Sequence, residues 1–133
     1  MSVPASKRDI KDIKETKSIK EIDISELRSI LGCTRRVFAQ ISGISERNVI
    51  RWERKIVKPN IKSHIILNKI EELCKTLVNI FGTQQKISKW LNESNKSLNG
   101  RTPIKQIISA PVLEEGIGQI IELLSGYKFG IAS

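Results

Sequence analysis

The sequence predicts an all-α protein in which a helix-turn-helix bundle is followed by a second small helical domain. Apolar residues recur every three or four positions through most of the chain, as one face of a helix requires. N-cap residues begin these repeats and glycines or prolines end them. The 133 residues have room for one or two small domains, and 39% hydrophobic with 28% charged residues is ordinary for a soluble globular protein.

The segment 34–54, TRRVFAQISGISERNVIRWER, predicts two short helices joined by a tight turn. Thr34 is a good N-cap for a first helix over residues 35–41. Gly43 can take the left-handed conformation that a sharp turn needs, and Ser45 can cap a second helix through residue 54. The apolar faces of the two helices, including Trp52, should pack on each other. This is the outline of a helix-turn-helix.

The outward side of the second helix carries long polar side chains that could reach base edges and phosphates in a major groove. Arg47, Asn48 and Arg51 are the best candidates for bases or nearby phosphates, and Arg35 and Arg36 for the DNA backbone. The full set of predicted DNA contacts is Arg35, Arg36, Ser45, Glu46, Arg47, Asn48, Arg51 and Lys55.

The distribution of charge agrees with a nucleic-acid partner. The chain has a net charge of +9, and residues 28–62 contain nine lysines and arginines against two glutamates. A phosphate-binding surface needs such an excess, although a charge run alone is more often a solvated face.

From Leu27 to Glu53 the chain resembles the Xre/Cro type of helix-turn-helix, with its Leu-Gly pair, its Gly-Ile-Ser turn and its Trp-Glu ending. The resemblance implies an internal, structural ion pair between Arg28 and Glu53. Two positions depart from the family: Arg35 replaces a usual glutamine, and Arg54-Lys55 stands where a glycine often ends the helix.

The N-terminal part is predicted in two pieces. Residues 1–21 are lysine-rich and poor in large apolar side chains, which favours disorder, with a weak helix or an arm that reaches DNA as alternatives. A helix capped by Ser25 and ended by Gly32 then completes the first bundle.

Beyond a break at residues 58–60, Ser63 can cap a long helix whose apolar spacing continues to Phe81. Its first half should complete the first bundle and its second half begin another domain. Thr83 and the two glutamines after it open a further helix, and a polar, turn-rich stretch covers residues 92–100. Pro103, after the cap Thr102, starts the next helix. A last amphipathic segment covers residues 112–124.

This second half resembles the toxin-binding domain of Xre/MbcA/ParS antitoxins. The resemblance rests on Phe81-Gly82, on the segment KWLN at 89–92 and on the segment LNGRTPI at 98–104. Residues 109–113 depart from the family, which more often has a Leu-x-Thr-x-x-Gly link there. We interpret Trp90 as a core residue and Arg101 as holding its loop to helix carbonyls. The residues expected to be structural are Arg28, Trp52, Glu53, Trp90, Gly100, Arg101 and Pro103.

The resemblance implies an antitoxin that represses its own operon and neutralises a toxin, usually a RES-domain toxin that consumes NAD. The C-terminal region of such antitoxins covers the entrance to the toxin's active site. Here, residues 126–133 would form an extended tail with aromatic anchors on one side. Its predicted toxin contacts are Tyr127, Lys128, Phe129, Gly130 and Ile131. The alternative is that Tyr127 and Phe129 fold back on the domain's own core.

The remaining features predict a cytoplasmic, non-enzymatic protein without metal or cofactor. Cys33 and Cys74 form no paired motif, and His64 is the single histidine. No phosphate loop, paired carboxylates, apolar membrane span or secretory leader is evident.

We therefore expect a flexible arm at 1–22, a DNA-binding domain at 23–62, and a toxin-binding and dimerisation domain at 63–133. The protein should be a homodimer on a pseudo-palindromic operator. Its dimer contact is expected in the second domain, because the first uses its small apolar surface internally. The alternative function is a stand-alone transcriptional regulator whose second domain dimerises or senses a ligand. A toxin-sized neighbouring reading frame would favour the antitoxin.

Overall fold

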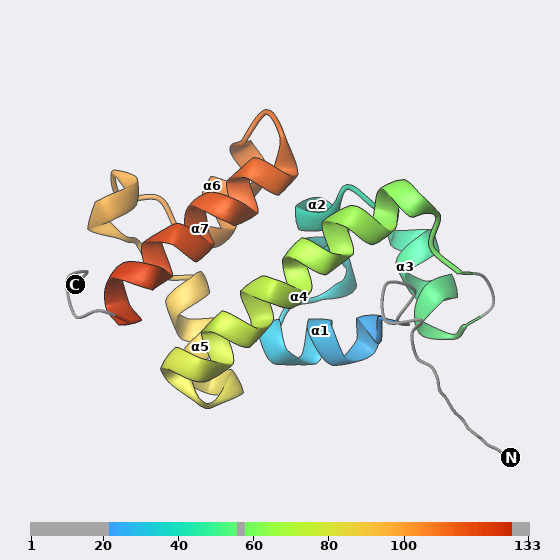
Figure 1. The fold of residues 1–133 in the computed structure, drawn as a ribbon, viewed down its shortest axis with the longest axis horizontal. Helices are drawn as coiled ribbons and strands as arrows, with labels where there is room; N and C mark the ends of the chain where they lie inside the picture. Colours follow the sequence, from blue (N-terminus) through green and yellow to red (C-terminus); the bar gives the residue numbers. More distant parts are fainter. Residues whose placement is uncertain (1–21, 56–57, 129–133) are drawn as a thin grey trace, which may run out of the picture.

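The computed structural model describes residues 22–55 and 58–128, which form seven α-helices and one 3₁₀ helix and contain no strand (Figure 1). The all-α prediction is confirmed. The elements are α1 Ile24–Leu31, α2 Arg35–Ser42, α3 Glu46–Glu53, α4 Ile61–Phe81, α5 Gln84–Leu91, η2 Lys96–Leu98, α6 Pro103–Ser109 and α7 Leu113–Lys128.

The 21-residue helix α4 lies between the N-terminal helices and α7 (Figure 1). Helix α7 runs beside α4 in the same direction. A Cβ atom added to Gly118 would lie 3.7 Å from Cε of Lys69, and further along the rings of Tyr127 and Phe81 are 6.4 Å apart. Helix α4 is therefore the common support of the N-terminal helices and the C-terminal helices.

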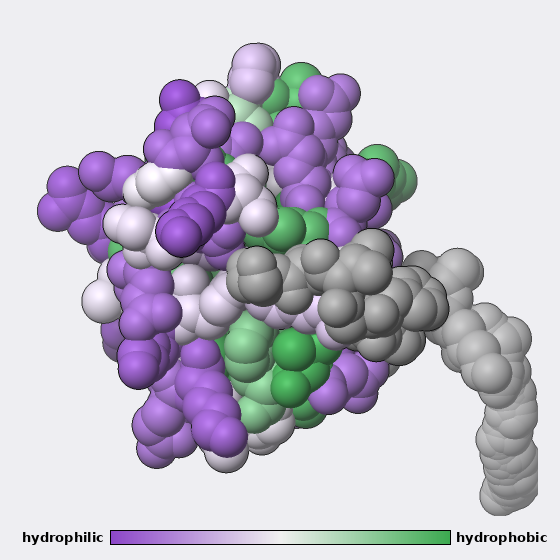
Figure 2. All heavy atoms as spheres, turned by 90° about the vertical axis from the view of Figure 1, so that its left-hand side faces the viewer, coloured by the Kyte–Doolittle hydropathy of each residue, from purple (hydrophilic) through white to green (hydrophobic). Residues whose placement is uncertain are grey.

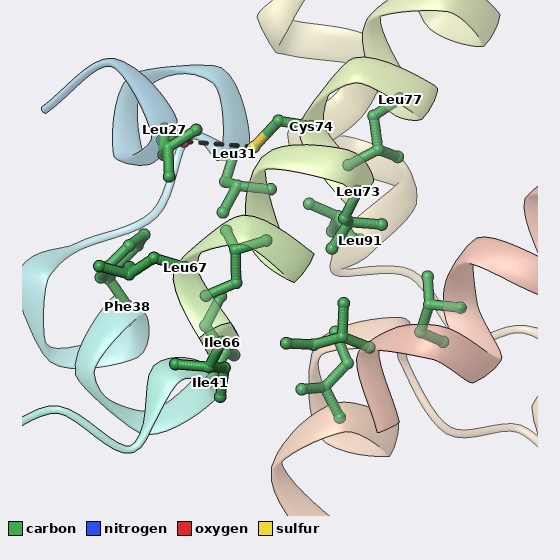
Figure 3. Packing of buried hydrophobic residues seen from close by; sticks show 14 of the residues in the cluster. Leu27, Leu31, Phe38, Ile41, Ile66, Leu67, Leu73, Cys74, Leu77 and Leu91 are labelled. Carbon is green, nitrogen blue, oxygen red and sulfur yellow. Dashed lines mark hydrogen bonds between the residues drawn. The ribbon is translucent and has the colours of Figure 1, made fainter. Parts of the chain in front are cut away.

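One cluster of buried apolar side chains runs from α1 to α7 (Figure 3). Helix α4 supplies Leu67, Ile70 and Leu73 to it, all with no exposed surface. Phe38 of α2 and Leu91 of α5 join the same cluster. Both halves of the long helix therefore contribute to one cluster. The division into two domains near residue 62 stays a prediction.

The ends of three helices differ from their predicted positions. Helix α1 is capped by Asp23, whose carboxylate accepts the N–H of Glu26 at 3.1 Å, and not by Ser25. Helix α4 is capped by Asn60, which accepts the N–H of Ser63 at 2.8 Å. Both earlier residues cap helices as well as serine does, so each helix starts sooner. The last helix continues four residues beyond the predicted end at 124, to Lys128.

The predicted arm at residues 1–22 lies outside the described residues except for Ile22, which is buried in the core. No helix in the described part of the chain has both the length and the apolar character needed to cross a membrane.

Candidate functional site

The turn between α2 and α3 has the predicted geometry. Thr34 accepts the N–H of Val37 at 3.1 Å, and Ser45 accepts that of Asn48 at 3.1 Å, so both predicted N-caps are confirmed. Gly43 has φ 72°, the left-handed conformation that glycine adopts without steric cost. The buried hydroxyl of Ser42 accepts the N–H of Ile44 at 3.2 Å, which braces the turn. The two helices thus form a rigid helix-turn-helix.

Three of the predicted DNA-contacting residues, Arg35, Arg36 and Glu46, border one surface hollow. On α3, Glu46 and Arg47 are exposed, and Asn48 and Arg51 are half-buried. Glu46 also borders a surface hollow whose other residues are Arg28, Thr34, Arg35, Arg36 and Ile50. The structure therefore brings the start of α2 and the start of α3 to the same hollow. Among the described residues, neither Arg47 nor Arg51 forms an ion pair.

Glu53, at the end of α3, binds two arginines from other helices. Its Oε2 lies 2.7 Å from Nε of Arg28, and its Oε1 lies 2.8 Å from Nε of Arg35. The Glu53 side chain is 5% exposed. Burial acts to raise the pKa of Glu53, but the hydrogen bonds and charges of the two arginines outweigh it and lower that pKa. The predicted ion pair of Arg28 and Glu53 is confirmed, and Glu53 ties α3 to both α1 and α2.

The second pairing was not predicted. The Nε of Arg35 donates a hydrogen bond to Oε1 of Glu53. About half of its side chain stays exposed (46%), so a contact with DNA by the rest of the guanidinium stays a prediction.

Helix α3 ends at Glu53, with Arg54 as its C-cap, one residue before the predicted end. Lys55 then has φ 60°, a left-handed conformation that glycine adopts more easily than lysine. A lysine adopts it at a cost of roughly 1 kcal/mol. The half-buried Trp52 packs against the core, as predicted.

At the opposite end of α4, three aromatic rings from different helices pack together. The Phe81 and Trp90 ring centroids are 5.6 Å apart, and the Trp90 and Tyr127 centroids are 5.7 Å apart at 81°. The indole Nε1 of Trp90 donates a hydrogen bond to the Tyr127 hydroxyl at 3.0 Å. The prediction that Trp90 is a core residue is supported, since it packs against the main cluster.

Asn95 organises the loop between α5 and α6, and the sequence analysis did not single it out. It is 8% exposed, and its carbonyl oxygen accepts the N–H groups of Leu98 and Gly100 at 3.0 and 2.9 Å. Its Oδ1 accepts the N–H of Ser97 at 2.9 Å, and its Nδ2 donates to the Tyr127 hydroxyl at 3.4 Å. The Asn-x-Ser spacing, typical of an Asx turn, was the available signal.

The segment Gly100–Pro103 behaves largely as predicted. Gly100 has φ 85°, and Pro103 is the first residue of α6 after the cap Thr102. Arg101 differs, because its exposed Nη1 donates to Oε1 of Gln106 at 3.2 Å and not to a helix carbonyl. The loop is instead closed by main-chain hydrogen bonds, in one of which the Asn95 N–H donates to the Arg101 carbonyl at 3.0 Å.

The region with the aromatic cluster and this loop has a counterpart among known families. Residues 76–130 match the family model of the antitoxin Xre/MbcA/ParS C-terminal toxin-binding domain. This segment is similar to that domain family. No curated protein matches the chain. The matched segment, called the toxin-binding domain below after that family model, consists of the end of α4 with α5, η2, α6 and α7. Trp90, Asn95 and Tyr127 hold its parts together.

The end of the toxin-binding domain differs from the predicted extended tail. Helix α7 continues through Lys128, so Tyr127 is helical and half-buried. Its ring and hydroxyl contact the domain's own core, in agreement with the alternative for Tyr127. Phe129, Gly130 and Ile131 lie outside the described residues. Figure 2 shows the side of the molecule that includes this end of α7, where apolar surface lies among polar side chains.

The two cysteines are free, and Cys74 is buried whereas Cys33 is half-buried. Cys74 donates a weak hydrogen bond to the carbonyl of Leu27 at 3.8 Å (Figure 3). Burial raises the pKa of Cys33 to about 11 and that of Cys74 to about 12. Both are therefore thiols at neutral pH and poor nucleophiles. The described residues contain no cluster of three or more potential metal ligands among His, Cys, Asp and Glu.

Proposed function

We propose that this protein is the antitoxin of a type II toxin-antitoxin system, and that it neutralises a toxin and represses its own operon. The observation that carries the proposal is the match of residues 76–130 to an antitoxin toxin-binding domain. A helix-turn-helix precedes this segment, and the long helix α4 connects the two. An antitoxin acts by binding, which needs no catalytic group, and we propose no catalytic activity.

For the toxin, we propose a RES-domain protein that consumes NAD, the usual partner of this antitoxin family. Residues 129–133 directly follow the helical turn that Tyr127 fixes, so they begin from a rigid base. A base of this kind lowers the entropy lost when a short segment enters a cleft. We propose that Phe129, Gly130 and Ile131 contact the toxin.

Growth in cells tests this half of the proposal. The product of the neighbouring toxin-sized frame is expressed with and without this chain, and growth and NAD content are measured. We expect toxin alone to stop growth and deplete NAD, and co-expression to restore both. If the toxin stops growth without NAD loss, the proposal of an antitoxin stands and the assignment of its partner as a RES-domain toxin is wrong. Growth arrest that this chain does not relieve would contradict neutralisation.

For the DNA, we propose that α3 lies in a major groove with Arg47, Asn48 and Arg51 at base edges or nearby phosphates. Arg36, at the hollow where α2 begins, would contact the backbone together with the first amides of that helix. Ser45 supports α3 as its cap, and Lys55 lies where the chain leaves it. Two half-sites require a homodimer and a pseudo-palindromic operator.

Binding to the DNA upstream of its own gene tests this half. We expect protection of two half-sites about one helical turn apart, with affinity that falls steeply as salt increases. Equal affinity for this DNA and for random DNA would contradict an autorepressor. A chain that binds the operator but no toxin would favour the stand-alone regulator.

A further inference from the structure

A groove with an apolar floor lies between α1 and α4, on residues that the proposed contacts with DNA and toxin do not use. Its floor consists of Leu27 and Ile30 from α1 and of Cys74 and Val78 from α4. Leu27 and Cys74 meet at the base, where the thiol donates to the carbonyl (Figure 3). Ile30 is half-buried and Val78 is 41% exposed, so apolar surface stays open along it. We call this hollow the α1–α4 groove.

The α1–α4 groove is large enough for several side chains and carries more negative than positive charge. It encloses about 450 Å³, whereas one water molecule takes about 30 Å³. The charged residues that line it are Glu26, Glu71 and Lys75. Just outside it, Asp23 adds a carboxylate, and the ion pair of Lys69 and Glu72 adds no net charge. A molecule that fits the groove therefore has an apolar face bordered by cations.

The sequence before the described residues contains a segment with such a face. Residues 7–17 follow Ser6, which is a good N-cap, and contain neither glycine nor proline. In a helix over this range, residues three or four positions apart share one side. The residues on that side are Ile10, Ile13, Lys14 and Lys17, with Lys7 and Asp9 at its edges. The carboxylates on the opposite side are Asp12 and Glu15.

The length of the segment and its point of attachment also fit the α1–α4 groove. A helix over residues 7–17 is about 16 Å long, and the stretch of α4 from Glu71 to Asn79 is about 12 Å long. The chain enters α1 through the buried Ile22, beside the end of the groove that Glu26 lines. Residues 18–21 are enough for the short loop that joins two antiparallel helices.

We propose that residues 7–17 dock as an amphipathic helix in the α1–α4 groove of the same chain. Running back along α1, the helix covers Ile30 and Val78 with its isoleucines and places its lysines near Glu26 and Glu71. Because the segment is tethered beside the groove, its effective concentration is in the millimolar range, and a small contact is enough. This inference is independent of the proposed contacts with DNA and toxin.

The docked helix would stabilise the bundle that holds the DNA-reading helix. Helix α1 carries Arg28, the partner of Glu53 at the end of α3. A helix packed against α1 and α4 therefore limits local opening of α1 and of this ion pair. The exposed side chains of α3 stay free in this arrangement.

Pairs of cysteines in the full-length chain test the contact. Ile13→Cys with Val78→Cys joins the apolar side of the segment to the groove, and Asp12→Cys with Val78→Cys is the matched control from the opposite side. In a glutathione redox buffer at low protein concentration, we expect the first pair to form an intramolecular disulfide at least about tenfold more readily than the control. Peptide mapping identifies the bonded residues. The native thiols give little background, because burial raises the pKa of both.

Hydrogen exchange of the full-length chain measures docking without added cysteines. We expect slowed exchange over residues 7–17, and Ile10→Gln combined with Ile13→Gln should remove it. Asp12→Asn combined with Glu15→Gln is the matched control on the opposite side and should leave it intact. Glu26→Lys should weaken the protection, and adding Lys17→Glu should restore part of it, because the pair then has opposite charges again. Circular dichroism checks that each variant keeps the helical fold.

Contrary results would overturn the inference in distinct ways. Equal disulfide formation by the two cysteine pairs, or exchange over residues 7–17 as fast as in an unstructured peptide, would show that the segment does not dock. Disulfides between two chains in place of one would assign the α1–α4 groove to the segment of a second copy. Protection that appears only after toxin or operator DNA is added would assign the segment to that partner.

Discussion

Replacing Tyr127 by phenylalanine isolates the contribution of one oxygen atom to the toxin-binding domain. The change keeps the ring that packs against Phe81 and Trp90 and removes the acceptor of two hydrogen bonds, at 3.0 Å from Trp90 and 3.4 Å from Asn95. A net hydrogen bond contributes about 0.5–1.5 kcal/mol, and the longer one lies near the limit of useful geometry. Tyr127 is also half-buried, so water can replace part of the loss. We expect the free energy of unfolding to fall by about 1–2 kcal/mol.

Urea unfolding followed by far-ultraviolet circular dichroism measures this change, with Tyr127→Ala as the comparison. The alanine variant also loses the ring contacts and should lose roughly 2–4 kcal/mol. Toxin capture by the folded phenylalanine variant should match wild type, because the hydroxyl faces the domain's own core. An unfolding free energy within about 0.5 kcal/mol of wild type would refute the reasoning. Intact stability with lost toxin capture would instead make the hydroxyl a direct toxin contact.

Three further changes test other parts of the structure. Glu53→Gln should lower the unfolding free energy at pH 7 by about 1–2 kcal/mol, since both arginine partners are partly exposed. The lowered pKa of Glu53 means that its contribution is present above its ordinary value of 4.5 and is lost as the pH falls below it, so urea curves of the variant should change less on acidification. Arg51→Ala should weaken operator binding by about 1–3 kcal/mol if Arg51 pairs a guanine, and equal losses on operator and random DNA would indicate a phosphate contact. Gly43→Ala should cost about 1–3 kcal/mol, because φ is 72° and the new Cβ would lie 3.0 Å from Leu113, whereas Gly118→Ala in α7 should be neutral or stabilising. Equal unfolding midpoints for the two alanine variants would contradict the strain at Gly43.

The features that the sequence predicted well depend on interactions between residues a few positions apart in the chain. Thr34, Ser45 and Thr102 each cap a helix through an amide three residues later, so the local pattern contains the whole interaction. The same holds for Gly43, whose left-handed turn follows from its missing side chain. Where two good caps stood close together, as Asp23 and Ser25, the pattern alone did not choose between them.

The features that were missed or mistaken depend on contacts between distant residues. Arg35 meets Glu53 only because α2 and α3 fold against each other. Tyr127 was expected in an extended tail, but its hydroxyl accepts hydrogen bonds from Trp90 and Asn95, more than thirty residues away, and this keeps the last turn of α7 helical. Alternating aromatic residues at a chain end do not reveal such partners.

Co-purification with the product of the adjacent toxin-sized reading frame tests the central claim most directly. The full chain is compared with a version that ends at Lys128, because a cut before Tyr127 would also remove the contacts that hold α7 to its domain. We predict that the full chain captures the toxin and that the shortened chain captures it much more weakly. Equal capture by both chains would leave the antitoxin proposal standing, but it would place the toxin contact in the helices and not in residues 129–133. Capture by neither, with operator binding intact, would contradict the account.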